Sequence, residues 1–353
     1  MAVISNLALN KRDDNSDQRQ SEQPDQRHTE QSAPAIMRAA VLEQPRTTGV
    51  AEHPLPTPGR GEVRVRLEGC GICASSLPLW EGRPWFHYPI APGNPGHEGW
   101  GVIDALGEGV THLQTGQRVA MLSQHAFAQY DVTAADAVVP LPPELDGLPF
   151  PGEAIGCAMN IFRRSDISAG QTVAIVGAGF LGLLLTQLVA SAGAQVIVLS
   201  RRQSALDQAR ANGAHATLGT DDFWGAVNGV KELTEQRGCD RVIEVVGLQP
   251  ALDLASELVA EYGKLVIGGY HQDGLRQVNM QQWNWRAIDV INAHERDPAR
   301  YIQGIREGIA AVLAQRIRPQ ELLTHHFKLN ELDQAFQMML DRPDGFIKGW
   351  LAL

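Results

Sequence analysis

Three glycines at a fixed spacing mark the first stretch of the sequence that could hold a ligand through its backbone. They are Gly177, Gly179 and Gly182, within VGAGFLG, and Phe180 and Leu181 stand between the last two. In a G-x-G-x-x-G turn the first glycine permits the tight turn, the second lets the backbone approach a pyrophosphate, and the third allows helix and strand to pack closely. The spacing predicts a dinucleotide site, with the pyrophosphate bound at the N-terminus of the following helix.

The segments around these glycines are those that such a site requires. The β-branched, apolar run over 172–176 predicts a buried strand, the apolar segment that ends near Gly193 predicts a helix, and residues 195–199 predict a second buried strand. Together they form a βαβ unit of about 30 residues, which is the length expected of a dinucleotide-binding unit.

The residues after the second strand bear on the choice of cofactor. Ser200, Arg201 and Arg202 stand where an acidic residue usually binds the ribose 2′-hydroxyl of NAD. A hydroxyl and two guanidinium groups suit a phosphate, which they bind through charge-assisted hydrogen bonds. We therefore predict a preference for NADP(H). The alternative is that both arginines are a solvated start to the next helix and that NAD(H) binds.

Composition excludes several classes of protein. With 353 residues, 44% hydrophobic and 20% charged, the chain has the ordinary mixture of a globular protein of about two domains. A formal net charge of −10 argues against nucleic acid or an anionic membrane as the main partner. The four cysteines are too few for a disulfide framework, and no apolar run has the length of a membrane span, so we expect reduced thiols in a cytoplasmic protein.

The chain divides by pattern into a tail and two domains. Residues 1–36 are rich in Gln, Asp, Arg and Ser and predict a disordered tail. Short alternating runs separated by Gly and Pro then predict an antiparallel β domain over 37–153. Alternating strand and helix patterns predict a doubly wound α/β domain over 154–294. The remaining segment, 295–353, is too small to be a domain and is expected to complete the first one.

The later part of the α/β domain is predicted in the same way. A connecting helix is expected over 151–165, and a helix over 251–262 between strands over 241–246 and 264–268. A last strand is expected over 289–292.

The order of motifs resembles the medium-chain dehydrogenase/reductase family, and within it the zinc-dependent alcohol and polyol dehydrogenases. The resemblance covers nearly all of 37–353. It is carried by GCGICASSL (69–77), NPGHEGWGVIDALGEGV (94–110), TGQRVAML (115–122), FAQYDV (127–132), VGAGFLG (176–182), THHFKLNELDQAF (324–336) and Ile347-Lys348. It implies a GroES-like β domain that carries a catalytic zinc ion, a Rossmann domain inserted in it, and an active site in the cleft between them.

The resemblance also implies the metal ligands. Cys73, His97 and Glu153 fall where the family has its three zinc ligands, and Glu98 is the alternative carboxylate that enters the coordination sphere in polyol-type members. Which carboxylate binds stays open. Only one zinc ion is expected, because the closely spaced cysteines of the family's structural zinc lobe are absent, and Cys70 is expected in the core.

Two positions depart from the family pattern. Ser76 stands where an aspartate often orients the zinc-bound histidine, and Pro78 replaces the histidine that relays protons in classical alcohol dehydrogenases. Proton transfer is then expected to use Ser75. The resemblance further implies that Lys348 reaches the cofactor pyrophosphate and that Cys157 lies against the nicotinamide.

These features together predict reversible oxidation of a secondary alcohol, such as a polyol or sugar, to its ketone or aldehyde. The expected partner is a small-molecule alcohol or carbonyl substrate, with no nucleic acid and no membrane. The resemblance implies a homodimer or homotetramer, because the strand over 289–292 resembles the family's dimer-forming edge. Alternative readings are a zinc-free quinone or enone reductase and a catalytically silent NADP(H)-binding protein. Candidate pocket residues are Trp80, Trp85, His87, Tyr270, Trp283 and Trp285.

Overall fold

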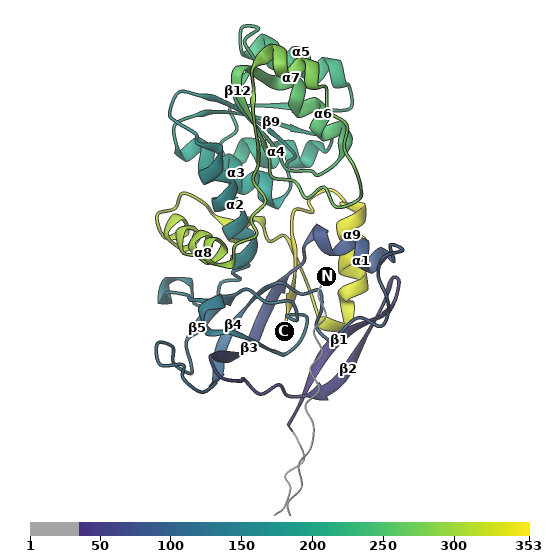
Figure 1. The fold of residues 1–353 in the computed structure, drawn as a ribbon, viewed down its shortest axis with the longest axis vertical. Coiled ribbons are helices and arrows are strands. Elements are labelled where there is room, and N and C mark those ends of the chain that lie inside the picture. Colours follow the sequence, from purple (N-terminus) through teal and green to yellow (C-terminus); the bar gives the residue numbers. More distant parts are fainter. Residues whose placement is uncertain (1–34) are drawn as a thin grey trace, which may run out of the picture. The chain divides into compact units, whose positions relative to one another are not determined.

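The computed structural model describes residues 35–353. The predicted disordered tail lies outside the described residues except at its last positions. There the boundary is corrected, because strand β1 begins at Ile36 rather than at Met37. An antiparallel sheet and a parallel sheet dominate the fold (Figure 1). Within residues 35–353, every helix is too short or too polar to cross a bilayer.

The first sheet, called the antiparallel sheet below, has the strand order β14-β15-β3-β4-β5-β7, and β6 also pairs with β3. All of its strand pairs are antiparallel except β14 with β15, which are parallel. Its central strand β3 (Glu62–Gly71) buries Val63, Val65 and Leu67, the alternation expected when one face of a strand covers a core. Strand β15 (Gly349–Ala352) pairs with β3, so the end of the chain returns to this sheet. The remaining strands are β4 (Glu98–Leu106), β5 (Arg118–Met121), β6 (Tyr130–Ala134), β7 (Val138–Pro140) and β14 (His325–Phe327), and a separate hairpin joins β1 (Ile36–Gln44) to β2 (Thr47–Pro54).

Two short helices cover the apolar side of this sheet. In α1 (Leu77–Glu81), the ring of Trp80 is 2% exposed and stacks on Phe336 of α9 (Leu332–Asp341), with 5.6 Å between ring centroids. The indole Nε1 donates a 2.8 Å hydrogen bond to Asp333. Trp80 is therefore a core residue and not the pocket residue that the sequence suggested.

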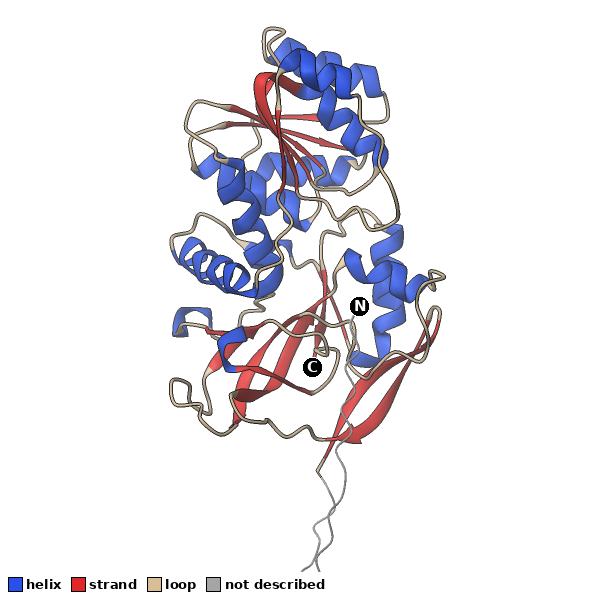
Figure 2. Cartoon of the chain, in the orientation of Figure 1, coloured by secondary structure: helices blue, strands red, loops and turns tan. Residues whose placement is uncertain are grey.

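The parallel sheet, drawn in red in the upper part of Figure 2, has the strand order β10-β9-β8-β11-β12-β13. Its topological switch lies between β8 and β11. The predicted βαβ unit is confirmed as β8 (Thr172–Val176), α3 (Phe180–Ser191) and β9 (Gln195–Ser200). The rest of this part comprises α4 (Gln203–Ala211), β10 (Ala216–Gly219), α5 (Phe223–Leu233), β11 (Cys239–Glu244), α6 (Gln249–Leu258), β12 (Val259–Ile267), α7 (Met280–Arg286) and β13 (Asp289–Asn292).

The boundary between α6 and β12 differs from the prediction. The helix expected over 251–262 ends at Leu258, because Val259 takes an extended conformation and pairs with Cys239 of β11. Strand β11 ends at Glu244 rather than at 246, since the Glu244 carboxylate accepts hydrogen bonds from the backbone N–H groups of the next turn.

A pair of helices links the two sheets in the chain. Helix α2 (Gly152–Ser165) packs against α8 (Pro298–Leu313) at close range. A Cβ atom on Gly308 would lie 2.5 Å from the Ile155 side chain, so only glycine permits this approach. The packing fixes the first turn of α2, which carries Glu153.

Candidate metal centre and cofactor site

Pairing of β3 with β4 brings the predicted metal ligands together. Gly71 of β3 lies opposite Glu98 of β4 in the register, Cys73 lies two residues beyond the end of β3, and His97 immediately precedes β4. One ligand atom from each of Cys73, His97 and Glu98 lies within 4.8 Å of the others. This set combines a thiolate sulfur, an imidazole nitrogen and a carboxylate oxygen, which are donors that zinc accepts.

The orientation of His97 comes from its own loop. Its Nδ1 lies 2.8 Å from the carbonyl oxygen of Pro95 and donates a hydrogen bond to it when it carries the proton, which leaves Nε2 free for a metal. Ser76, which replaces the family's aspartate, is 3% exposed, and its hydroxyl has no hydrogen-bond partner among residues 35–353. A backbone carbonyl thus supplies the contact that the sequence pattern lacked.

The electrostatics of the cluster favour a cation. Burial alone would lower the pKa of His97, but the neighbouring Cys73 and the carboxylates of Glu153 and Glu98 raise it to about 10. The site therefore has a strongly negative potential at the imidazole, which would retain a proton when no metal is bound. A divalent cation neutralises the same charges. The residues present fit a zinc ion.

The two candidate carboxylates have different surroundings. Glu98 is fully buried, and the Nζ of Lys348 lies 2.6 Å from its carboxylate. A Cβ atom on Gly71 would lie 1.9 Å from Glu98, so this glycine makes room for the carboxylate. Glu153 is outside the cluster of three and accepts a 3.3 Å hydrogen bond from the Cys157 thiol. Burial raises the pKa of Glu153.

Other predicted residues gather around this centre. The Ser75 hydroxyl donates a 3.2 Å hydrogen bond to the sulfur of Cys73, so it lies beside the candidate metal. The ammonium group of Lys348 also lies 5.2 Å from the ring centroid of Phe180, the first residue of α3. Lys348 therefore stands between the metal cluster and the pyrophosphate helix, with its charge paired to Glu98 rather than free for the cofactor.

The glycine-rich turn has the geometry of an anion site. Gly177 has a φ of 114°, and a Cβ atom on Gly182 would lie 1.9 Å from the Gly177 carbonyl oxygen, so both positions require glycine. Gly179 is the N-cap of α3 and offers no side chain to the first N–H groups of the helix. In the described chain no atom lies within 4 Å of the place that its Cβ would take. A pyrophosphate can occupy that space and accept those hydrogen bonds.

The residues at the end of β9 separate into two roles. Arg202 is partly buried, and its Nη1 donates a 2.7 Å hydrogen bond to the carbonyl oxygen of Phe346. Arg201 is exposed and has no ion pair with any residue that the structure describes. The sequence analysis gave both arginines the same role, but their environments differ. Arg202 is held by the C-terminal segment, and Arg201 faces solvent.

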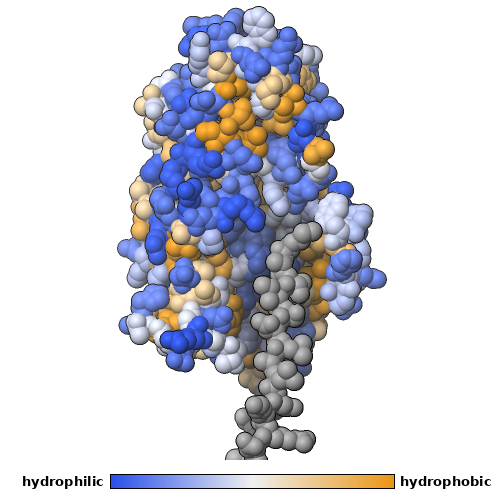
Figure 3. All heavy atoms as spheres, viewed as in Figure 1, coloured by the Kyte–Doolittle hydropathy of each residue, from blue (hydrophilic) through white to orange (hydrophobic). Residues whose placement is uncertain are grey.

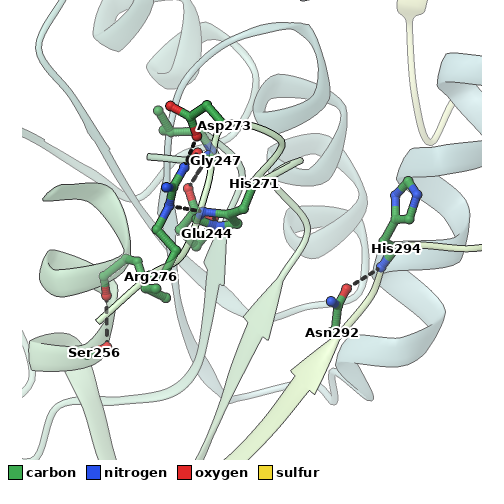
Figure 4. Close-up of polar contacts among 10 residues, drawn as sticks. Glu244, Gly247, Ser256, His271, Asp273, Arg276, Asn292 and His294 are labelled. Carbon is green, nitrogen blue, oxygen red and sulfur yellow. Dashed lines mark hydrogen bonds and ion pairs between the residues drawn. The ribbon is translucent and has the colours of Figure 1, made fainter. Parts of the chain in front are cut away.

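A polar network that sequence reasoning missed lies at the carboxyl ends of β11 and β12 (Figure 4). Glu244 is fully buried and lies 3.0 Å from Nε2 of His271. Arg276 donates from Nε to Nδ1 of His271, at 2.9 Å, and from Nη2 to the carbonyl oxygen of Gly247, at 3.0 Å. The network ties the loop after β12 to the turn after β11. The signal for this network in the sequence was Glu244, an acidic residue two positions before the Val246-Gly247 turn.

The residues predicted to line a substrate pocket differ in exposure and packing. Tyr270 is 51% exposed and stacks on His294, with 5.2 Å between ring centroids. Trp283 packs against the apolar core of the parallel sheet. Trp85 and Trp285 are largely exposed, and so is His87. The backbone of Tyr270 lies beside Gly247 of the polar network, so Tyr270 remains a candidate for the pocket.

Comparisons with known proteins agree with this geometry. Residues 59–143 match the model of the alcohol dehydrogenase GroES-like domain, and residues 181–308 match that of the zinc-binding dehydrogenase. The chain is 28% identical over 320 residues to a sorbitol dehydrogenase of Halalkalibacterium halodurans, covering 81% of this chain and 91% of the relative. It is 24% identical over 343 residues to D-arabinitol dehydrogenase 1 of Uromyces fabae, covering 88% and 96%.

Solved structures share the fold. A short chain alcohol dehydrogenase (rspB) from E. coli CFT073, complexed with NADH, aligns with a TM-score of 0.79 at 22% identity, over 90% of this chain and 99% of that chain. A putative zinc-binding dehydrogenase from Sinorhizobium meliloti 1021, bound to NADP, aligns with a TM-score of 0.77 at 24% identity, over 90% and 100%. At these identities the likeness establishes the fold.

Proposed function

Because the chain belongs to the medium-chain dehydrogenase/reductase family, we propose that it is a zinc-dependent, NADP(H)-linked oxidoreductase that interconverts a secondary alcohol and its ketone or aldehyde. The observation that carries the proposal is the cluster of Cys73, His97 and Glu98, whose ligand atoms lie within 4.8 Å of one another. Oxidation and reduction of alcohols is the chemistry of the curated relatives, whose names include sorbitol, D-arabinitol and alcohol dehydrogenases. A polyol or related secondary alcohol is the proposed substrate.

The chain's own residues would divide the work as follows. A zinc ion at the cluster supplies Lewis acidity toward the substrate oxygen, and a bound nicotinamide supplies the hydride acceptor. The N-terminus of α3, open at Gly179, binds the pyrophosphate. We propose that the Ser75 hydroxyl, which lies 3.2 Å from the Cys73 sulfur, takes the proton from the substrate hydroxyl while it gives up its own proton toward solvent. The thiol of Cys157 donates a hydrogen bond to Glu153, beside the candidate metal centre.

Two observations bear on the alternatives. A catalytically silent NADP(H)-binding protein would fit a decayed site in which Ser76 replaces the aspartate, but in this chain the carbonyl oxygen of Pro95 lies 2.8 Å from Nδ1 of His97 and can orient it instead. A zinc-free quinone or enone reductase has no use for a thiol, an imidazole and a buried carboxylate gathered at one point. We therefore favour the zinc enzyme over both.

Metal analysis with cofactor titration on one sample tests the proposal. Purified protein should hold about one zinc ion per chain, as a single catalytic site requires. The Cys73→Ser variant should lose the zinc, while Cys239→Ser, which changes a cysteine in the core of the parallel sheet, should keep it. NADPH should bind more tightly than NADH. Protein that binds cofactor but never zinc would refute the Lewis-acid mechanism.

We also propose a homodimer or a dimer-based tetramer. Strand β13 is the edge of the parallel sheet and is mostly exposed, so its free backbone groups can pair with a second copy. Val290 on this strand is 38% exposed, and nearby Trp285 on α7 is 79% exposed. Figure 3 shows separate hydrophobic patches on a largely hydrophilic surface. Light scattering of Val290→Lys, expected to shift toward monomer, checks the proposal.

A further inference from the structure

One histidine joins the loop after β12, residues 268–279, to the turn after β11 (Figure 4). Nε2 of His271 lies 3.0 Å from Oε2 of Glu244, which is fully buried, and Nδ1 of His271 lies 2.9 Å from Nε of Arg276. The Arg276 guanidinium group also donates to the carbonyl oxygen of Gly247, at 3.0 Å. His271 therefore bridges a buried carboxylate and a guanidinium group.

These contacts fix the protonation state of His271. The Nε of Arg276 can only donate a hydrogen bond, so Nδ1 of the imidazole accepts it and carries no proton. A neutral imidazole has one N–H group, which must then be at Nε2, where it donates to Glu244. A second proton, at Nδ1, would set one N–H group against another and break the hydrogen bond from Arg276.

The charged groups around His271 decide the effect of that second proton. Glu244, on β11, attracts a charged imidazole, but the nitrogen that must take the proton faces Arg276. Asp273 pairs with Arg276 in the same loop, and the other histidine near this segment, His294, stacks on the tyrosine that precedes His271. Among residues 35–353, no carboxylate besides Glu244 pairs with His271. The closed loop therefore resists the proton, whereas an open loop exposes Nδ1 to water and accepts it, so acid favours the open loop.

The turn that His271 holds is packed against the glycine-rich turn. The Glu244 carboxylate accepts hydrogen bonds from the backbone N–H groups of Val246 and Gly247, at 2.6 and 2.7 Å. A Cβ atom on Gly177 would lie 2.7 Å from the Val246 side chain, so no side chain fits between the two turns. Both turns follow neighbouring strands, β8 and β11, at the topological switch where such sheets bind their ligands. Movement of the turn after β11 therefore reaches the cofactor site.

We propose that His271 is a pH-sensitive latch on the cofactor site. The neutral imidazole closes the loop over 268–279 onto the turn after β11, and the protonated imidazole releases Arg276, so that the loop opens. The closed loop fixes the turn that borders Gly177, and the dinucleotide is bound more tightly in that state. Histidine is the side chain whose charge ordinarily changes between pH 5 and 8. The link to the cofactor rests on the proposed binding of a dinucleotide at the glycine-rich turn.

The first test measures amide exchange of the full chain at pH 8 and pH 5.5, expressed as protection relative to an unstructured chain at the same pH. In the wild type, protection over 268–279 should fall about tenfold or more at the lower pH, the scale of one lost hydrogen bond to a charged group. The matched variant is His271→Gln, whose amide can donate to Glu244 and accept from Arg276 but takes up no proton. Its protection should be the same at both pH values.

Two further variants assign the effect to this contact. Arg276→Gln leaves no guanidinium group for the protonated imidazole to displace, so the pH response should be lost there as well. His294→Phe keeps an aromatic ring beside Tyr270 but removes the other nearby histidine, and it should retain the response of the wild type.

The second test is calorimetric titration of the same proteins with NADP⁺ and NAD⁺. For the dinucleotide that the wild type binds more tightly at pH 8, the fall in affinity to pH 5.5 should be about fivefold larger in the wild type than in His271→Gln. Comparison with the variant removes every effect of pH that does not pass through His271, including protonation of a phosphate on the ligand.

The outcomes separate the latch from the proposed function. A wild-type loop that is equally protected at both pH values, or a fall in protection that persists in His271→Gln, would overturn the latch. A fall in protection without the extra loss of affinity would overturn its link to the cofactor site. If neither dinucleotide binds at pH 8, the proposed function and that link are wrong, while amide exchange still decides whether His271 holds the loop.

Discussion

The buried ion pair between Lys348 and Glu98 makes the sharpest test of the structure. Their charged atoms lie 2.6 Å apart, and the side chains are 8% and 1% exposed. Replacement of Lys348 by methionine keeps an unbranched, apolar chain of similar length but removes the charge. The Glu98 carboxylate would then be buried without its hydrogen-bonded cation, and the remaining cation of the cluster, the His97 imidazolium, is shared with the carboxylate of Glu153.

The expected loss of stability is large. Removal of one partner from a buried ion pair costs about 3–5 kcal/mol. In a chain of this size about 2 °C of melting temperature corresponds to 1 kcal/mol, so Lys348→Met should melt roughly 6–10 °C below the wild type. The double variant Glu98→Gln/Lys348→Met removes both charges and should recover most of that loss, since no unpaired ion is left.

Circular dichroism melting of metal-stripped protein measures these differences without compensation from a bound cation. Lys264→Met is the matched control: its partner Asp166, 3.5 Å away, is 76% exposed, so that pair should contribute less than about 1 kcal/mol. A melting temperature of Lys348→Met equal to that of the Lys264→Met control would refute the buried pair. So would a double variant whose loss of melting temperature equals the sum of the losses of the two single variants.

Three further outcomes are expected. Asp344→Asn removes the negative charge beside Arg202 and should tighten binding of adenosine 2′,5′-bisphosphate about threefold, at the scale of a surface charge contact; weaker binding in calorimetry would contradict this. Cys70 and Cys239 should resist Ellman's reagent at pH 8 until the protein is unfolded, because burial raises the pKa of both thiols, that of Cys239 to about 12; mass spectrometry of the modified sites checks it. Arg276→Gln removes the hydrogen bonds to His271 and Gly247 and should speed amide exchange over 268–279; unchanged exchange would show that the network does not hold this loop.

The sequence predicted most reliably what is encoded locally. The strand over 172–176 agrees with β8 at both ends, because β-branched residues run directly into glycines that no helix would tolerate there. The helix expected over 251–262 was wrong beyond Leu258, because whether Val259 continues a helix or joins β11 depends on a partner strand that local periodicity does not reveal.

Long-range pairing explains what the sequence could not provide at the site. Lys348 and Glu98 are 250 positions apart. The sequence alone indicated a separate role for each, with Lys348 at the cofactor pyrophosphate and Glu98 as a metal ligand. Arg202 meets the Phe346 carbonyl oxygen only because the segment after α9 docks on the turn after β9. Trp80 likewise looked like a pocket residue until Phe336 covered its ring.

The departure at Ser76 shows how a fold can absorb the loss of a side chain. A carboxylate in the family pattern would accept the imidazole proton from across the site, and its loss suggested a weakened centre. In this chain Pro95, two positions before His97, presents its carbonyl oxygen to Nδ1 at 2.8 Å. Ligand and orienting group then lie on one short segment held against β4, so substitution at a distant side chain leaves the tautomer that binds a metal unchanged. The remaining cost is the buried Ser76 hydroxyl, which lacks a partner among the described residues.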